Sequence, residues 1–470
     1  MSMVTQPQFD RDAELDSMQA HVELALEQAR KKGATSAEIS AHTSQGLSVS
    51  VRVGEVETLE YMQDRGISVS VLLGKRKGHA SSADLSQQSI DLCVSKALEI
   101  ARYVQEDPCN GLAEAELLAT EFPDLDIWHP AALDATAAIE RALSCEAAGR
   151  ENPKITNSEG ASFDAGLGIG VYGNSHGFIG RSAGTHFSQS CVLIAGKGDA
   201  MQRDYSFDSR RSLADLEPAE ATGREAAMRT VRRLGARKIK TARLAVLLAP
   251  EVAKSLIGNF VGAISGSALY RNASFLKGSA GQQLFPAWLN LTEHPHLLRG
   301  AGSAAFDGEG VATRDHCIVG EGVLRDYLLS SYSARRLGLQ TTGNSGGVRN
   351  LTLMSGGGSG GGSGGGSGGG SGGGSGGGNE PDLMAGMESG LYVTEVMGQG
   401  VNLVTGDYSR GASGFMIKNG QIGQPVEEVT IAGNLRDMFL NIVAAGSRLD
   451  TRGNIHAGEI LLAEMVVAGG

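Results

Sequence analysis

The spacing of apolar residues changes several times along the first 110 positions. Between residues 12 and 32 apolar side chains recur every three or four positions, which predicts an amphipathic helix ending at Gly33. Over residues 47–53 and 67–71 they alternate with serine and other polar residues, which predicts antiparallel strands with one polar face. Helical spacing returns at residues 90–104. The pattern therefore predicts a sheet with flanking helices.

The same alternation of helix and strand patterns continues to the C-terminus. Further strands are predicted around residues 166–172, 191–195, 205–208 and 244–248, and further helices at about 131–148, 216–234 and 250–265. The basic stretch at residues 237–240 is a plausible boundary between domains. Because helices and strands do not alternate regularly as βαβ units, the predicted fold class is α+β with antiparallel sheets and flanking helices. The predicted domains are residues 1–236 and 237–470.

One segment differs from the rest of the chain. Residues 355–378 are six perfect copies of Ser-Gly-Gly-Gly. Such a run cannot bury apolar surface and is predicted to be a flexible linker, inserted by engineering or expansion into a surface loop of the second domain. It carries no information about function.

Composition and charge exclude several classes of protein. The net charge is −11 and aromatic residues make up only 5% of the chain, so a nucleic-acid partner is not expected. The five cysteines are never spaced as CxxC, which favours a reducing compartment over a disulfide framework. The first thirty residues show no secretory signal, and no apolar run of about 18 residues is present. The expectation is a soluble, cytoplasmic protein without membrane contact.

Two glycine motifs match catalytic or nucleotide-binding patterns but lie in the wrong context. Residues 173–177 match G-x-S-x-G, yet the following Phe-Ile-Gly is typical of the return strand of a hairpin and not of a helix. Residues 168–173 match G-x-G-x-x-G, but their glycines alternate with apolar residues within a predicted strand. Neither a serine hydrolase nor a dinucleotide site is favoured.

Metal ligands are sparse in the sequence. Among ten histidines there is no H-E-x-x-H and no helical pair four residues apart. His294, His296, His316 and Cys317 offer donor atoms at short spacing, but a zinc site needs three or four converging groups. These four residues remain an alternative metal site that the sequence cannot assemble by itself.

The most specific sequence stretches lie in the C-terminal half. Residues 393–400 (VTEVMGQG), 405–415 (TGDYSRGASGF) and 430–435 (TIAGNL) closely resemble the PmbA (TldE) branch of the TldD/PmbA metallopeptidase family. Residues 77–82 (KGHASS) and 173–177 (GNSHG) in the N-terminal half agree with it. The resemblance covers the whole chain except the Ser-Gly repeat.

The resemblance implies a subunit of a heteromeric zinc metallopeptidase. In this family the TldD-type subunit binds zinc through an H-E-x-x-x-H helix and a distant cysteine, and zinc lowers the pKa of its bound water to about 7. In an alignment that is gap-free across the strand–helix unit, the two histidines fall on Ile257 and Gly262 and the glutamate on Gly258, and near the C-terminus the cysteine falls on Ala457. None of these four side chains can bind zinc or act as a base, so no catalytic, cofactor-binding or metal-binding residue is predicted in this chain.

The residues that replace the motif allow two interpretations. Gly258, Gly262 and Gly266 recur every four positions on one predicted helix face, where each glycine costs about 1 kcal/mol relative to alanine. The stripe either packs tightly within the chain or forms a smooth wall for a peptide or a partner subunit. His456 is either a remaining ligand or an ordinary polar residue of a loop.

The leading hypothesis is a supporting subunit that pairs with a TldD-like, zinc-binding chain to trim or degrade unfolded peptides, including leader peptides of modified precursors. Backbone pairing with a strand edge is the expected mode of peptide recognition. One alternative is a stand-alone peptide-binding or regulatory homodimer without proteolysis. Another is a self-sufficient metallopeptidase that uses the histidines and the cysteine named above.

Overall fold

The computed structural model describes residues 9–132, 134–355 and 382–469. The predicted linker 355–378 therefore lies outside the described residues, apart from the backbone of Ser355 at its first position.

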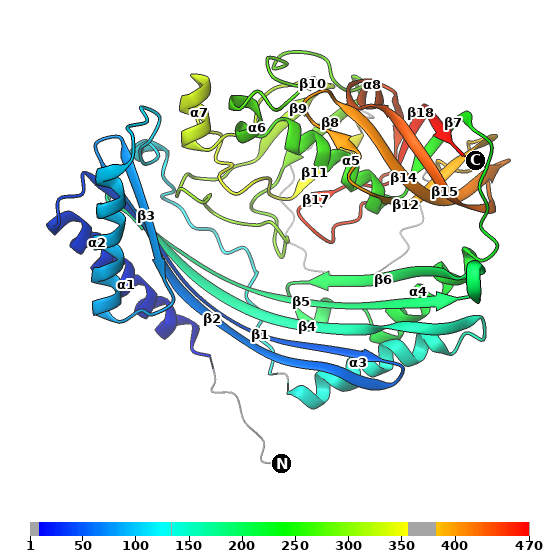
Figure 1. Ribbon diagram of the computed structural model, residues 1–470, viewed down its shortest axis with the longest axis horizontal. Coiled ribbons are helices and arrows are strands. Elements are labelled where there is room, and N and C mark those ends of the chain that lie inside the picture. The colour runs from blue at the N-terminus through cyan, green and yellow to red at the C-terminus, as the bar shows by residue number, and fades with distance from the viewer. Residues whose placement is uncertain (1–8, 133, 356–381, 470) are drawn as a thin grey trace.

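The N-terminal half of the chain is built on one curved, six-stranded antiparallel sheet (Figure 1). Its strand order is β3-β2-β1-β4-β5-β6. The strands are β1 (Ser36–Arg52), β2 (Glu55–Leu73), β3 (Arg76–Ser82), β4 (Ile155–Asn174), β5 (Ile179–Ala195) and β6 (Gln202–Arg210). The motif at residues 173–177 forms the turn between β4 and β5, and residues 168–173 lie within β4, so the hairpin and strand contexts predicted for both motifs are confirmed.

Four helices cover one face of this sheet: α1 (Arg11–Lys31), α2 (Gln87–Tyr103), α3 (Ala135–Arg150) and α4 (Ala219–Arg232). Apolar residues of α1 and α2 pack on one end of the sheet and those of α3 and α4 on the other. The helix predicted to begin near residue 131 begins at Ala135, because the side chain of Asp134 accepts a hydrogen bond from the Ala137 amide and caps it there.

The opposite face of the sheet faces the C-terminal half (Figure 1) and carries polar side chains along β1, β4 and β5. Ser48 Oγ donates to Asp164 Oδ1 at 2.6 Å across the β1–β4 pair, and the hydroxyls of Ser162 and Ser190 lie 2.9 Å apart. The predicted division into one apolar and one wet face is confirmed.

Part of strand β2 is uncovered. Residues 55–65 are exposed on both faces and, among the described strands, pair only with β1, because β3 pairs with β2 from residue 67 onward. This stretch also exposes large apolar side chains, including Tyr61 (56%) and Met62 (52%). It is an open sheet edge at which an extended backbone can pair.

The C-terminal half contains two further sheets. In the first, β7 (Ala242–Leu248), β18 (Ile460–Ala468), β15 (Gln421–Asn434), β14 (Asp407–Lys418) and β12 (Ser389–Met397) pair in succession, and β12 returns to β7 to close a ring. Strands β13 (Val401–Asn402) and β16 (Ile442–Ala445) pair with β14 and β18. The second sheet contains β10 (Val323–Leu324), β9 (His316–Gly320), β8 (Leu289–Glu293), β11 (Leu351–Ser355) and β17 (Ile455–His456).

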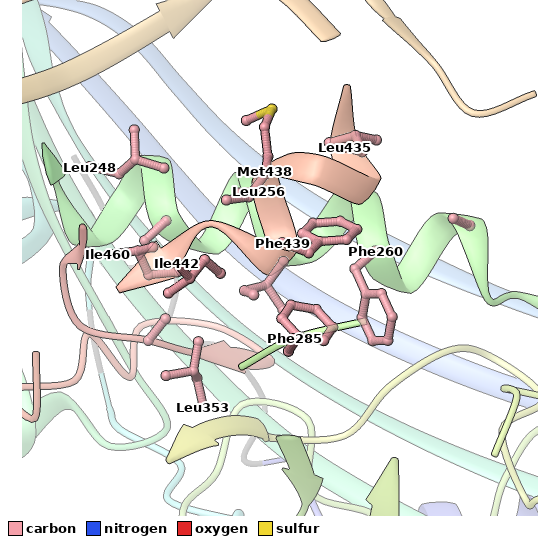
Figure 2. Packing of buried hydrophobic residues seen from close by; sticks show 14 of the residues in the cluster. Leu248, Leu256, Phe260, Phe285, Leu353, Leu435, Met438, Phe439, Ile442 and Ile460 are labelled. Atoms are coloured by element: carbon pink, nitrogen blue, oxygen red, sulfur yellow. The ribbon is translucent and has the colours of Figure 1, made fainter. Parts of the chain in front are cut away.

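Helix α5 (Pro250–Ala263) packs between these two sheets. Its apolar residues share one core with leucine, isoleucine and valine side chains of both sheets, and Figure 2 shows Phe260 beside Phe285 and Phe439. The ring centroids of Phe260 and Phe285 lie 5.0 Å apart in an edge-to-face arrangement. Shorter helices α6 (Gly266–Tyr270), α7 (Ser331–Leu337) and α8 (Leu435–Leu440) surround this core.

The predicted α+β class is confirmed. The prediction of antiparallel sheets needs one addition, because β7 pairs with β12 and β11 pairs with β17 in parallel. Three short 3-10 turns complete the described structure, at Ala115–Leu117, Gly198–Ala200 and Leu213–Asp215. In the part of the chain that the structure describes, no helix is both long and apolar enough to cross a membrane.

Candidate functional site

Helix α5 carries three of the four positions that align with the zinc motif. Strand β7 leads into it through Ala249, and Pro250 occupies its first turn, where the missing N–H leaves no helical hydrogen bond unmade. One side of the helix is buried in the core that Figure 2 shows, through Leu256 and Phe260 among others. The other side carries Glu251, Lys254, Gly258 and Gly262, all partly accessible.

The four motif-equivalent positions, Ile257, Gly258, Gly262 and Ala457, present no donor atoms. Ile257 and Ala457 are both fully buried in the apolar core of the C-terminal half. A Cβ added at Gly258 would meet only Ile455 Cδ1, at 3.9 Å, and one at Gly262 would lie 3.2 Å from Leu403 Cδ1. Helix α5 contacts strand β17, which directly precedes Ala457, so the position that aligns with the family cysteine adjoins the helix, but the side chains at the four motif-equivalent positions offer no zinc ligand.

Among the residues that the structure describes, no second backbone packs closely against α5 at Gly258 and Gly262. At Gly258 and Gly262 the nearest atoms to an added Cβ belong to side chains, so the interpretation of tight backbone packing is wrong for these two residues. Gly266 differs, because it lies at the start of α6 and an added Cβ would come within 2.2 Å of Ser333 Oγ. The three glycines therefore do not form one continuous surface of a single helix.

His456 is buried within strand β17 and is not an ordinary loop residue, as one interpretation had it. Its side chain is 3% exposed, with Nε2 3.0 Å from the Gly453 carbonyl oxygen and Nδ1 3.4 Å from Thr352 Oγ1. Burial lowers the pKa of His456, since the charged imidazolium would lose its hydration. The residue before Ala457 is thus a buried imidazole whose neutral form is favoured.

The alternative metal ligands are dispersed among separate partners. His294 Nδ1 lies 3.1 Å from Asp315 Oδ2, His296 Nε2 lies 3.1 Å from Thr313 Oγ1, and His316 Nε2 lies 3.1 Å from Asp326 Oδ2. The Cys317 thiol is directed at the Val319 carbonyl oxygen, 3.4 Å away. Within residues 9–132, 134–355 and 382–469, no three His, Cys, Asp or Glu side chains are grouped so that they could hold a metal ion.

The first turns of α5 are tied to both halves of the chain by buried charges. Lys254 Nζ lies 2.6 Å from Asp450 Oδ2, and Glu251 Oε1 lies 3.1 Å from Arg229 of α4. Arg452 pairs with both acids, at 2.9 Å from Asp450 and 3.2 Å from Glu251. Burial alone would raise the pKa of Asp450, but the hydrogen bonds from Arg452 and Lys254 outweigh it and lower that pKa to about 2. These charges fix the helix relative to the N-terminal half.

A cavity of about 320 Å³ opens beside this network, between the polar face of the N-terminal sheet and the C-terminal half. Its lining includes His186 of β5, Arg210 and Arg211 at the end of β6, the loop 297–301 and His456. Sequence reasoning did not find it, although the Arg210-Arg211 doublet directly after a strand was visible. Four separate chain segments form the cavity, and no local pattern brings them together.

The chain is similar to known proteins along nearly its whole length. Profiles of the PmbA/TldA metallopeptidase domains match residues 37–101 (domain 1), 128–234 (central domain) and 241–469 (C-terminal domain). The chain is 45% identical to "Metalloprotease PmbA" of Escherichia coli O157:H7 over 97% of both chains. The chain belongs to the PmbA/TldD metallopeptidase family. The predicted resemblance is confirmed.

Further relatives are similar to this chain in sequence or in fold. A PmbA homologue of Haemophilus influenzae is 42% identical over 97% of both chains. The solved structure of TldE from Thermococcus kodakarensis superposes with a TM-score of 0.79 at 17% identity, covering 96% of this chain and all of that one, and so shows the shared fold. A Bacteroides thetaiotaomicron protein, described as a candidate modulator of DNA gyrase, gives a TM-score of 0.86 at 26% identity, with coverage of 97% and 99%.

The family profiles divide the chain more finely than the sequence pattern did. The profiles for domain 1 and the central domain match segments whose strands join in the single sheet β3-β2-β1-β4-β5-β6. The predicted boundary near residue 237 lies between the central and the C-terminal match. The two-domain division itself stays a prediction.

Proposed function

We propose that this chain is the PmbA/TldE-like subunit of a TldD/TldE-type zinc metalloprotease complex that trims or degrades unfolded peptides. The single observation that carries the proposal is the chemistry of the motif-equivalent positions, where Ile257, Gly258, Gly262 and Ala457 offer no metal ligand and no general base. The zinc ion and the base that activates its water would belong to the TldD-like partner, where zinc polarises the scissile carbonyl. Among the relatives, a TldD homologue of Haemophilus influenzae is 24% identical over 190 residues.

Two structural features support a role in holding extended peptide. The polar face of the N-terminal sheet carries small hydroxyl side chains such as Ser48, Ser162 and Ser190, which obstruct an approaching chain little. The open edge of β2 at residues 55–65 leaves backbone N–H and C=O groups free to pair with an extended segment. Unfolded peptides present such segments, whereas folded domains have already paired theirs.

The proposal is tested by reconstituting the complex from separately purified chains. This chain alone, the TldD-like chain alone and an equimolar mixture are incubated with an unstructured peptide, and native mass spectrometry with elemental analysis reports stoichiometry and zinc. We expect a complex that cleaves the peptide, with the zinc retained by the TldD-like chain after separation. Peptide cleavage by this chain alone, together with one zinc ion per chain, would overturn the proposal.

The test also separates the two alternatives. Alanine substitution of His294, His296, His316 and Cys317 would abolish activity only if those residues formed a metal site, and their dispersed positions predict no effect. Peptide binding by a homodimer that ignores the TldD-like chain would support a stand-alone binding protein.

A further inference from the structure

The cavity beside His456 is lined by an unusual combination of cationic and apolar side chains. Arg210, Arg211 and Arg299 contribute positive charge, whereas Asp215 is the acidic residue in the lining. Leu297 and Leu298 complete one side and are 43% and 63% exposed. In a chain with a net charge of −11, this concentration of guanidinium groups favours an anionic over a cationic ligand.

The three arginines differ in how their charges are compensated. Arg299 lies 2.6 Å from Asp126 and 2.8 Å from Asp215, and Arg210 lies 3.1 Å from Asp208. Arg211 has no carboxylate within ion-pair distance among the residues that the structure describes. Its burial lowers the pKa of the guanidinium, which nevertheless remains charged at neutral pH. Arg211 therefore carries the cationic charge of the cavity that no acid offsets.

Backbone carbonyl groups hold Arg211 in place but do not use all of its donors. Nε donates to the Gly300 carbonyl, Nη1 to the Thr185 carbonyl at 3.2 Å, and Nη2 to the Ala301 carbonyl. A guanidinium group has five N–H donors, so one N–H on each of Nη1 and Nη2 is left over. These two remaining N–H groups match in number the two oxygens of a carboxylate, which guanidinium groups commonly bind.

We propose that this cavity binds a carboxylate group of an extended peptide through Arg211, with the adjoining apolar side chain of the peptide resting against Leu298. The inference rests on the proposed function for the nature of the ligand and adds the chemical group that is recognised. The carboxylate can belong to the C-terminus of the peptide or to an Asp or Glu side chain. Because His456 lines the cavity and precedes Ala457, a peptide held there lies beside the position of the lost cysteine.

Binding of short labelled peptides to the purified full chain tests this proposal. The probes are a fluorescent Gly-Ser-Gly-Ser-Gly-Leu with a free C-terminal carboxylate, the same peptide with a C-terminal amide, and an amidated version with an internal Asp. We expect the free acid to bind at least about tenfold more tightly than the amide, because a hydrogen-bonded charge pair is lost. Tight binding of the amidated Asp peptide would assign the site to side-chain carboxylates.

Two substitutions locate the interaction. Arg211→Gln should abolish the preference for the acid, whereas Arg211→Lys should keep part of it, since lysine retains the charge but not the paired donors. Equal affinity of the wild-type chain for all three peptides, or an unchanged preference in Arg211→Gln, would show that the proposal is wrong.

Arg211 bonds to both halves of the chain, so its substitution could reduce binding by disturbing the fold. A second variant at another residue tests the site without this risk. Leu298→Asp places a negative charge in an exposed position of the lining and should weaken binding of the free acid about tenfold without altering the unfolding temperature. Arg243→Gln, on an exposed arginine that pairs with Glu464, is the matched control and should bind like the wild type. If Leu298→Asp also binds the acid normally, the proposal fails.

The result of the peptide-binding experiment does not depend on the result of the reconstitution experiment that tests the proposed function. Carboxylate binding requires neither the TldD-like partner nor zinc. A chain that prefers the acid but forms no complex would refute the proposed function alone, and an active complex without that preference would refute this inference alone.

Discussion

The two ends of helix α5 have opposite character. Its first turns carry Glu251 and Lys254, whose charges are bound by Arg229, Arg452 and Asp450. Its second half carries Gly258 and Gly262, which meet only the tips of Ile455 and Leu403. Helix α5 therefore combines a charged end that is fixed to both halves of the chain with a second half whose motif-equivalent positions offer no metal ligand.

The largest expected effect comes from breaking the charged end. Asp450→Ala leaves Lys254 and Arg452 without their shared partner in a site where the Asp450 side chain is only 7% exposed. We expect the free energy of unfolding to fall by about 3–5 kcal/mol, measured by urea denaturation. The control is Glu464→Ala at the exposed pair with Arg243, where a loss of less than about 1 kcal/mol is expected. Equal losses in the two variants would contradict the importance assigned to the charged end.

The ion pairs of Asp450 also predict that the stability of the chain depends on pH. The pKa of Asp450 is about 2 in the folded chain and about 3.9 for an unperturbed aspartate, so its contribution is present above about pH 4 and is lost as the pH falls toward 2. We therefore expect the stability difference between the wild type and Asp450→Asn to shrink by about 2 kcal/mol over that range. A constant difference from pH 6 to pH 2.5 in urea titrations would argue against ion pairing at this residue.

A smaller effect is expected where a glycine is sterically required. Gly266→Ala would place a methyl group against Ser333, whose side chain takes part in the capping box of α7. The overcrowding should lower the free energy of unfolding by about 1–3 kcal/mol. A stabilised Gly266→Ala variant would show that α7 can move away freely.

The smallest expected change in stability concerns the glycines in the second half of α5. Gly258→Ala adds a methyl group that meets only Ile455 Cδ1, at an ordinary contact distance of 3.9 Å, so it should raise the free energy of unfolding by about 0.5–1 kcal/mol. Gly262→Ala should gain less, because Leu403 Cδ1 at 3.2 Å must shift. Thermal denaturation of the two variants side by side measures the difference, and a loss of stability in Gly258→Ala would reveal a packing partner that the structure does not place there.

Much of the architecture could be predicted from periodicity. Alternation around Val49 and Val69 identified strands with one polar face, and helical spacing identified α1, α2 and α5. The parallel pairing of β7 with β12 could not be predicted, because the two strands are separated by about 140 residues and pair through backbone atoms that every residue shares. The closed ring of strands could not be predicted either, because it depends on this same long-range pairing.

At the candidate site, the sequence determined the chemistry of the side chains, and the tertiary structure decided their surroundings. The absence of donors at Ile257, Gly258, Gly262 and Ala457 is a property of side-chain chemistry, so the sequence determined it once the alignment was made. The burial of His456 and the charge of Arg211 without an opposing acid were decided by tertiary structure alone. Both depend on which distant segments come to lie around a residue, and desolvation and ion pairing act over a few ångströms of space regardless of the separation along the chain.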